Sequence, residues 1–168
     1  KGTGTVVMDG SNQSFTGSTV FFNLHKQSFT NDEVLFFPTA MRQAVSGSLI
    51  LRGNTGSTMD LRASRDTAQA QLVLFGYSSP YQDTRRLDVK DSDASGSGDN
   101  KAVELICDNA CIDSTNNDNW RFFTPIITGV VYNDEGVIPI PSAAIAMSVN
   151  GGPISDEDLA DAGGQFVL

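Results

Sequence analysis

The stretch DSDASGSGDNKAVELICDNACIDSTNNDN, residues 91–119, contains the pattern that decides the fold class. A short apolar run, Lys101–Cys107, lies between two loops rich in Asp, Asn, Gly and Ser. These loop residues favour turns because their side chains bond the local backbone or their backbones accept unusual angles. Short runs of Val, Ile and Leu favour strands instead. The stretch therefore predicts one strand held between two exposed acidic loops.

The same unit, a short apolar run followed by a turn signal, recurs along the whole chain. It predicts an all-β protein: a single antiparallel β-sandwich or jelly-roll-like domain of about ten to twelve short strands. No repeat at a fixed period is visible, which argues against a solenoid. The expected strands are Thr3–Met8, Thr19–Leu24, Val34–Phe37, Ser48–Arg52, Thr58–Arg62, Gln71–Tyr77, Arg86–Lys90, Lys101–Cys107, Trp120–Thr124, Ile126–Tyr132, Ala144–Val149 and Gln165–Leu168.

Helix signals are few. Ser155–Asp158 fits a capping box, and Gly163 and Gly164 would end the helix after about two turns. Thr39–Val45 could form one further helical turn. The segments Arg52–Gly56 and Ser64–Thr67 are expected to be hairpin loops, because their Gly, Asn and Asp residues suit tight turns. At most one or two short helices are therefore expected in the sandwich.

Length and charge limit the possible partners. The 168 residues are expected to form one domain, residues 1–168. Sixteen Asp against four Glu place the acidity mainly in loops. The net charge of -9 argues against a nucleic-acid partner, which requires a basic stripe. No membrane span is expected, because prolines and glycines interrupt the uncharged segment Gly136–Ser155.

The two cysteines, Cys107 and Cys111, are separated by three residues. They are too few for a disulfide framework and, with the single His25, too few for a structural zinc site. A local disulfide is the preferred interpretation, and a pair of buried free thiols is the alternative. A disulfide requires residues 108–110 to turn back, since a fully extended chain would hold the two Cα atoms too far apart. It would indicate an oxidising location.

The loop that begins at Asp91 partly follows a calcium-binding pattern. Oxygen ligands fall at Asp91, Asp93 and Ser95, Gly96 follows, and Asp99 occupies the ninth position. The bidentate Glu expected at position twelve is replaced by Ala102, and no helix is expected on either side. Calcium at Asp91, Asp93, Ser95 and Asp99 is therefore a possible cofactor, and a solvated loop is the preferred interpretation. No other cofactor is expected.

No catalytic motif is apparent, and the protein is not expected to be an enzyme. His25 is the only histidine, so a Ser-His-Asp or Cys-His arrangement would have to use it. A nucleophile elbow is missing, and a surface position for His25 is the simpler interpretation. Aromatic side chains suited to a carbohydrate-binding face are scattered, at Tyr77, Tyr81, Trp120 and Tyr132.

Both termini have strand-like sequences. Thr5, Val6, Val7 and Met8 lie near one end and Phe166, Val167 and Leu168 at the other, and these residues are the candidate assembly strands. Residues 1–9 could be exchanged with a neighbouring subunit by β-augmentation. The alternative is a pair of ordinary terminal strands in a self-contained sandwich. Asn12 begins the sequon Asn12–Ser14 and is a candidate glycosylation site.

Three functions are compatible with these observations. The first is a non-catalytic structural subunit of an extracellular or cell-surface assembly, such as a pilus-like filament, whose partners are copies of itself. The second is a jelly-roll capsid or decoration protein of a virion. The third is a secreted carbohydrate-binding or calcium-stabilised adhesin module. Fold alone does not decide between them.

Overall fold

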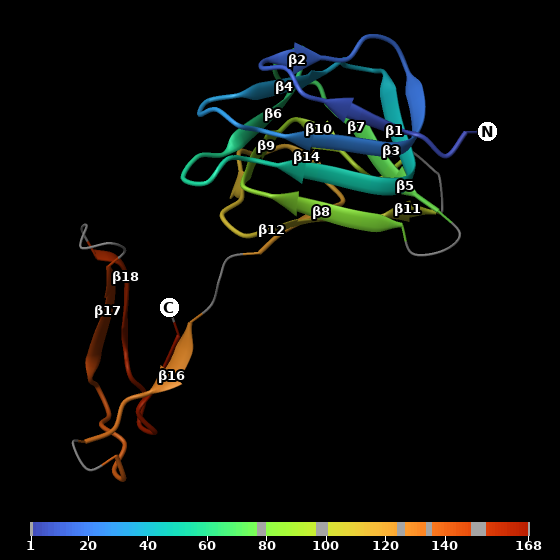
Figure 1. The fold of residues 1–168 in the computed structure, drawn as a ribbon. Coiled ribbons are helices and arrows are strands. Elements are labelled where there is room, and N and C mark those ends of the chain that lie inside the picture. Colours follow the sequence, from blue (N-terminus) through green and yellow to red (C-terminus); the bar gives the residue numbers. More distant parts are fainter. Residues whose placement is uncertain are drawn as a thin grey trace. The chain divides into compact units, whose positions relative to one another are not determined.

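The computed structural model describes residues 2–76, 80–96, 101–123, 127–133, 136–148 and 154–167. They form two units, Lys1–Thr124 and Pro125–Leu168. All regular elements in these residues are β-strands (Figure 1). In this part of the chain no helix is long and apolar enough to cross a membrane.

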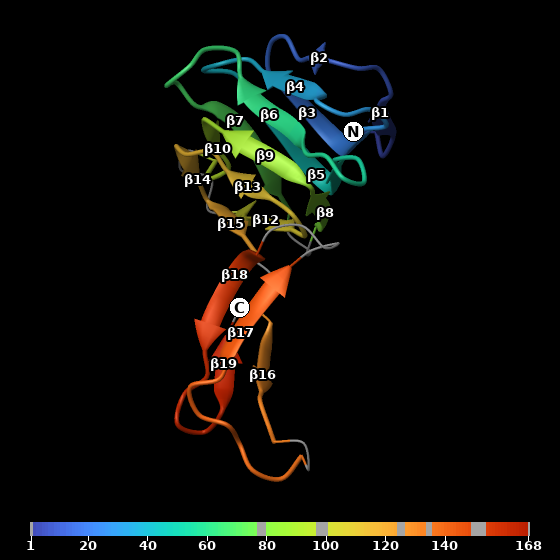
Figure 2. The same cartoon turned by 90° about the vertical axis from the view of Figure 1, so that its left-hand side faces the viewer.

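The first unit is a β-solenoid of about four turns. One wall is a five-stranded sheet, parallel throughout, in which strands of successive turns lie side by side (Figure 2). Its strands, in sheet order, are β13 (Ile112–Asp113), β9 (Leu87–Lys90), β6 (Met59–Ala63), β4 (Val34–Phe37) and β2 (Gln13–Ser14).

The remaining walls come from a ten-stranded sheet, and β11 is its one antiparallel member. In chain order its strands are β1 (Thr5–Met8), β3 (Thr19–Gln27), β5 (Arg42–Arg52), β7 (Ala70–Phe75), β8 (Tyr81–Arg85), β10 (Ser92–Asp93), β11 (Ala102–Val103), β12 (Leu105–Asp108), β14 (Asn117–Asp118) and β15 (Trp120–Phe122).

The longest strands bend between two walls of the solenoid. The first part of β5, Arg42–Val45, pairs with β7, and its last part, Ser48–Arg52, pairs with β8. Gly47 lies between the two parts. A Cβ there would stand 2.6 Å from Asn23 Oδ1, so a larger residue would push the neighbouring strand away. Glycine at this position lets β5 approach the neighbouring strand β3 closely at the bend.

Alternation within each strand builds the core. In β4, Leu35 and Phe37 are buried while Phe36 is partly exposed, as expected when neighbouring side chains point to opposite faces. Parallel register stacks equivalent positions, so Leu35 aligns with Leu61, and Leu61 with Val89. All of these inward residues belong to one apolar cluster that fills the solenoid. Burying each such side chain contributes roughly 1.5–3 kcal/mol.

The corners explain why the chain turns where it does. After the strands of the five-stranded sheet, Ala40, Thr67, Asp91 and Asn116 all adopt positive φ, between 57° and 66°. Asn and Asp accept this conformation better than most residues. Asp91 also connects three corners, because Asn116 Nδ2 donates to its Oδ1 (2.7 Å) and the Thr67 amide donates to its Oδ2 (3.3 Å). Side chains of residues 91–119 thus link successive turns of the solenoid by hydrogen bonds.

The first turn of the solenoid contains a buried charge. Lys26 is 1% exposed, and its Nζ donates to the Gly10 carbonyl, to Gln13 Oε1 (3.2 Å) and to the Glu33 carboxylate. Three acceptors match the three donors of an ammonium group. Burial raises the pKa of Glu33, but hydrogen bonds from Lys26 and Ser28 and the charge of Lys26 lower it by more, so the net shift is downward. The Lys26–Glu33 pair is therefore buried with hydrogen-bond partners for its polar groups.

Several predictions about the fold are wrong, including the helical turn expected at Thr39–Val45, where β5 begins at Arg42, and the hairpin expected at Ser64–Thr67, which joins strands of different sheets. The expected antiparallel sandwich or jelly roll is a mostly parallel solenoid, and the expected helix at Ser155–Asp158 is part of strand β18 (Ile154–Leu159). The predicted hairpin loop at Arg52–Gly56 is a corner between β5 and β6, which belong to different sheets. A fixed period is absent because the turns differ in length: Lys26 aligns with Leu51, and Leu51 with Thr84, at unequal spacing.

The second unit contains two antiparallel pairs. Strand β16 (Thr128–Val130) pairs with β19 (Gln165–Val167), and β17 (Ala144–Ser148) pairs with β18. Main-chain and side-chain hydrogen bonds fix the turns, such as those that Asp161 Oδ1 accepts from the Gly163 and Gln165 amides. The Val167 amide donates to Asp158 Oδ2 (2.9 Å) and so joins the two pairs.

Candidate functional site

The C-terminal unit, Pro125–Leu168, exposes many large apolar side chains for its small size. Among its residues whose burial is described, only Ala160 and Gly164 are buried. Val137 is 71% exposed and Leu159 is 65% exposed. The other large apolar side chains that remain exposed in this unit are Ile127, Val130, Tyr132, Ile138, Ile140 and Val167. A set of this kind on one small unit is typical of an interaction surface.

This unit is close to the lower size limit of independently stable domains. Isolated two-stranded sheets are marginally stable in water, and domains below about 40 residues usually require disulfides, metals or oligomerisation. The segment 125–168 contains no cysteine. It also contains six of the twenty acidic residues and none of the eleven Lys and Arg. The unit therefore combines little burial, open strand edges and an excess of negative charge.

The candidate assembly residues at the two ends lie in different units. Thr5, Val6, Val7 and Met8 form β1, which pairs in parallel with β3. Within the described residues no strand pairs with the other side of β1, and Val7 is 63% exposed. At the other end, Phe166 and Val167 belong to β19, and Leu168 lies outside the described residues. The structure does not bring the two ends together in one sheet.

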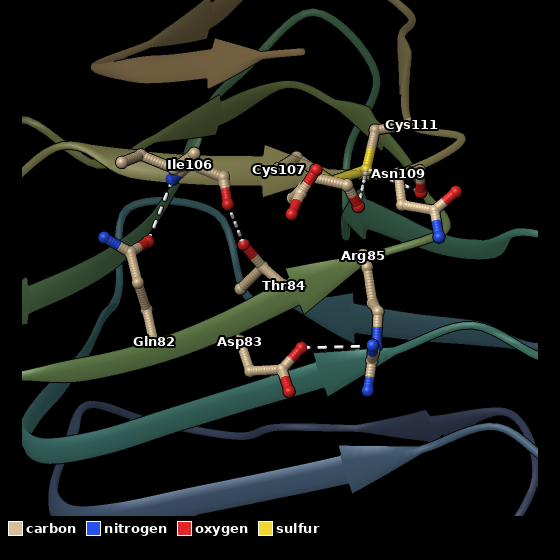
Figure 3. Close-up of a disulfide and its surroundings, with 9 residues drawn as sticks. Gln82, Asp83, Thr84, Arg85, Ile106, Cys107, Asn109 and Cys111 are labelled. Atoms are coloured by element: carbon tan, nitrogen blue, oxygen red, sulfur yellow. Dashed lines mark hydrogen bonds and ion pairs between the residues drawn. A yellow bond between two sulfur atoms is a disulfide. The ribbon is translucent and has the colours of Figure 1, made fainter. Parts of the chain in front are cut away.

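The cysteines lie in the solenoid rather than in an exposed loop. A disulfide joins Cys107 to Cys111, with 6.0 Å between the two Cα atoms. Cys107 is fully buried in β12, and Cys111 packs against the core just before β13 (Figure 3). Asn109 and Ala110 adopt positive φ between them, which makes the required turn. The disulfide fixes a corner of the last turn of the solenoid.

The predicted calcium ligands take part in local hydrogen bonds. Asp93 Oδ1 accepts hydrogen bonds from the amide and hydroxyl of Ser95, and its Oδ2 accepts one from Gln71 Nε2. Asp91 connects the corners described above. In the described ranges, no three His, Cys, Asp or Glu side chains are grouped to hold a metal ion. Asp99 lies outside these ranges, and calcium binding stays a prediction.

His25 forms a hydrogen bond with Ser48 on the outer side of the ten-stranded sheet, with 2.8 Å between Nε2 and Oγ. A nucleophile and base at this distance would resemble part of a hydrolase site. Within the described residues, however, Ser48 is the one hydrogen-bond partner of the imidazole. The Ser48 amide already donates to Asn23 Oδ1 (2.8 Å), so it does not provide an oxyanion-binding donor. The pair is a cross-strand contact.

The aromatic residues proposed for carbohydrate binding have different environments. Trp120 packs against the core, and its Nε1 donates to Ser92 Oγ (3.0 Å). Tyr132 lies in the C-terminal unit, and Tyr77 is outside the described residues. Tyr81 is 57% exposed at the start of β8. Of the four aromatics, Tyr81 alone is described as an exposed residue of the solenoid.

A groove of about 380 Å³ adjoins Tyr81 between β8 and β12. The two strands are paired only at Thr84–Cys107 and Arg85–Asp108. Beyond these pairs the Gln82 side chain replaces the missing backbone hydrogen bonds. Its Nε2 donates to the Glu104 carbonyl (3.0 Å). Its Oε1 accepts from the Ile106 amide (2.9 Å), as Figure 3 shows. No signal in the sequence identified this groove, because it results from the pairing of two strands in adjacent turns.

Asn12, the candidate glycosylation site, is exposed at a corner with a φ of 47°. Its Oδ1 accepts a hydrogen bond from the Val34 amide (2.9 Å). That contact uses the side-chain oxygen of Asn12. A glycan would be attached to the side-chain nitrogen, which forms no hydrogen bond with a described residue. Glycosylation stays a prediction.

Comparison with known proteins identifies no relative: no protein-family model, no curated protein and no solved structure matches the chain.

Proposed function

We propose that the protein is a non-catalytic structural subunit of an extracellular assembly, in which copies of the chain associate through the C-terminal unit. One observation carries this proposal: the unit exposes eight large apolar side chains and, among the residues whose burial is described, buries only Ala160 and Gly164. A second copy is the favoured partner because the unit needs a cover whenever the chain folds. Most soluble oligomers are built from identical chains for which this cover is always available.

The strand content also supports association between copies. Two separate two-stranded sheets leave open edges that can accept strands from another copy. The solenoid provides a rigid body with a continuous core, and the disulfide within it is compatible with an oxidising, extracellular location. The open edge of β1 offers a second contact, which would extend a closed oligomer into a filament.

Analytical ultracentrifugation of the full chain tests the proposal. The full chain should sediment as an oligomer, whereas the variants Val137→Asp and Leu159→Asp should dissociate it, because a charge would be buried in the interface. Both side chains are exposed in the single chain, so neither change should disturb the fold of one copy. Val20→Asp is the matched control, since Val20 is 61% exposed on the solenoid.

Two results would contradict the proposal. One is that the full chain sediments as a monomer even at concentrations well above those at which extracellular proteins occur. The other is dissociation by Val20→Asp together with no effect of the two C-terminal variants. Removal of residues 1–9 tests the β1 contact separately: it should limit filament growth while leaving the oligomer of C-terminal units intact.

A further inference from the structure

The groove between β8 and β12 differs in chemistry from the apolar C-terminal surface. Alternation along β8 buries Thr84 and directs Tyr81, Asp83 and Arg85 to the outer side. Ile106, Asp108 and Asn109 complete the outer part of the lining. The groove therefore presents an exposed ring, one apolar side chain, two carboxylates, a guanidinium and a carboxamide.

The polar groups of the groove are held in place by neighbouring strands. Arg52, on β5, donates to Asp83 Oδ2 through Nε (2.9 Å) and through Nη2. Arg85 Nε lies 3.3 Å from Asp83 Oδ1. Hydrogen bonding and charge from Asp83, with a smaller contribution from Tyr81, hold the pKa of Arg52 above its ordinary value. Asp83 is thus held by guanidinium groups from two strands, which reduces the entropy lost when a ligand binds.

Hydrogen-bonding capacity remains for a ligand. Arg85 Nε is shielded from solvent and faces Asp83 Oδ1, but the Arg85 side chain as a whole is 38% exposed, so a ligand can meet the outer part of its guanidinium. Asp108 and Asn109 are exposed at the same groove. A ligand rich in hydroxyl groups would donate to the carboxylates and accept from the guanidinium and the carboxamide. The exposed face of Tyr81 would cover the apolar C–H face of a sugar ring.

We propose that this groove binds a neutral oligosaccharide. Its size, about 380 Å³, falls within the usual range for small-molecule sites. Neutral rather than acidic saccharides are favoured because the groove has two carboxylates against one guanidinium of its own lining, in a chain of net charge -9. The same charge disfavours nucleic acid. The inference is independent of assembly, since it concerns the solenoid alone.

Isothermal titration calorimetry with the full chain tests this site. The probes are four soluble neutral oligosaccharides, of maltose, cellulose, xylan and chitin type, and one acidic oligogalacturonate. At least one neutral probe should bind, and Tyr81→Ala and Asp83→Asn should each weaken it on the order of tenfold, through lost stacking and lost hydrogen bonds. Trp120 fluorescence should show that both variants keep a folded solenoid.

Tyr132→Ala is the matched control, because Tyr132 is 48% exposed but lies in the C-terminal unit. It should leave the affinity for a single soluble oligosaccharide unchanged, whatever its effect on assembly. The inference is overturned if no neutral probe binds at millimolar concentration, if only the acidic probe binds, or if both groove variants bind as the unmodified chain does. Each of these outcomes leaves the proposed assembly untouched.

Discussion

Removal of the Glu33 carboxylate should destabilise the first turn of the solenoid strongly. Lys26 and Glu33 are almost fully buried, so Glu33→Ala leaves a buried ammonium without its countercharge. Loss of one member of a buried pair costs about 3–5 kcal/mol of unfolding free energy. The Gly10 carbonyl and Gln13 Oε1 still accept from Nζ in the variant. We therefore expect the lower end of this range, about 3 kcal/mol.

Two comparison variants separate the missing charge from the missing contact. In Lys26→Met/Glu33→Leu both charges are replaced by apolar groups of similar size, and most of the stability should return, to within about 1–2 kcal/mol of the original chain. Glu104→Ala removes a carboxylate that pairs with Arg121 at 3.0 Å, where both side chains are about half exposed. This change should cost less than about 1 kcal/mol.

Denaturant unfolding monitored by the fluorescence of Trp120 is a suitable assay, because the single tryptophan packs against the core of the solenoid. A solenoid can unfold turn by turn, so hydrogen exchange of β2 and β4 should be measured as well. Faster exchange there with an unchanged Trp120 transition would indicate local opening of the first turn. If Glu33→Ala changes neither measurement by more than Glu104→Ala does, the buried pair does not have the stabilising role inferred for it.

The lowered pKa of Glu33 adds a pH dependence of known sign. A carboxyl group whose pKa is lower in the folded chain than in the unfolded chain stabilises the fold at a pH above its ordinary value of 4.5. That contribution is lost as the pH falls below 4.5 and through the lowered folded value. The stability difference between the original chain and Lys26→Met/Glu33→Leu should therefore change in this acidic window, whereas it should be constant between neutral pH and pH 6.

Three further predictions concern other parts of the molecule. Gly53→Ala should lower the unfolding free energy by about 1–3 kcal/mol, since a Cβ there would stand 2.0 Å from the Arg86 carbonyl oxygen, whereas Gly4→Ala should be neutral because no atom lies within 4 Å. Cys111→Ser should cost roughly 2 kcal/mol and speed hydrogen exchange in β12 and β13, and equal stability of both forms would show that the disulfide is dispensable. Raising the salt concentration should strengthen association, because like-charged C-terminal units repel one another; a weakening measured by ultracentrifugation would contradict this.

The positions of the strands could be predicted from sequence, but their partners could not. Val34–Phe37 is a strand with the expected bounds, and Ala144–Ser148 and Gln165–Val167 lie within expected strands. A short apolar run reports local burial, which a sandwich and a solenoid share. Parallel pairing joins residues of successive turns, such as Leu51 and Thr84. The number of residues between paired positions differs from turn to turn, so the pairing leaves no period in the sequence.

The candidate sites followed the same division. The disulfide could be inferred from two cysteines and a turn-forming segment, because both signals are local. The groove beside Tyr81 could not, since β12 and the corner after it supply three of its eight lining residues. The Asp and Asn residues between 91 and 119 suggested an ion site. Many of them instead fill corner positions and bond the backbone of the previous turn, as Asn117 Nδ2 does to the Val89 carbonyl (2.8 Å).

The acidic residues of the C-terminal unit oppose association between copies, and they should also limit aggregation. Exposed apolar strands with open edges aggregate when nothing discriminates between partners. Glu157 and Asp158 lie in β18 next to the exposed Leu159, and the unit contains no Lys or Arg to offset their charge. Repulsion between these carboxylates disfavours disordered contacts among many copies. An ordered interface that buries the apolar side chains and keeps the carboxylates apart has little electrostatic cost. The charges should therefore select an ordered oligomer, and neutralising Glu157 and Asp158 together should increase insoluble aggregate rather than the yield of the ordered form.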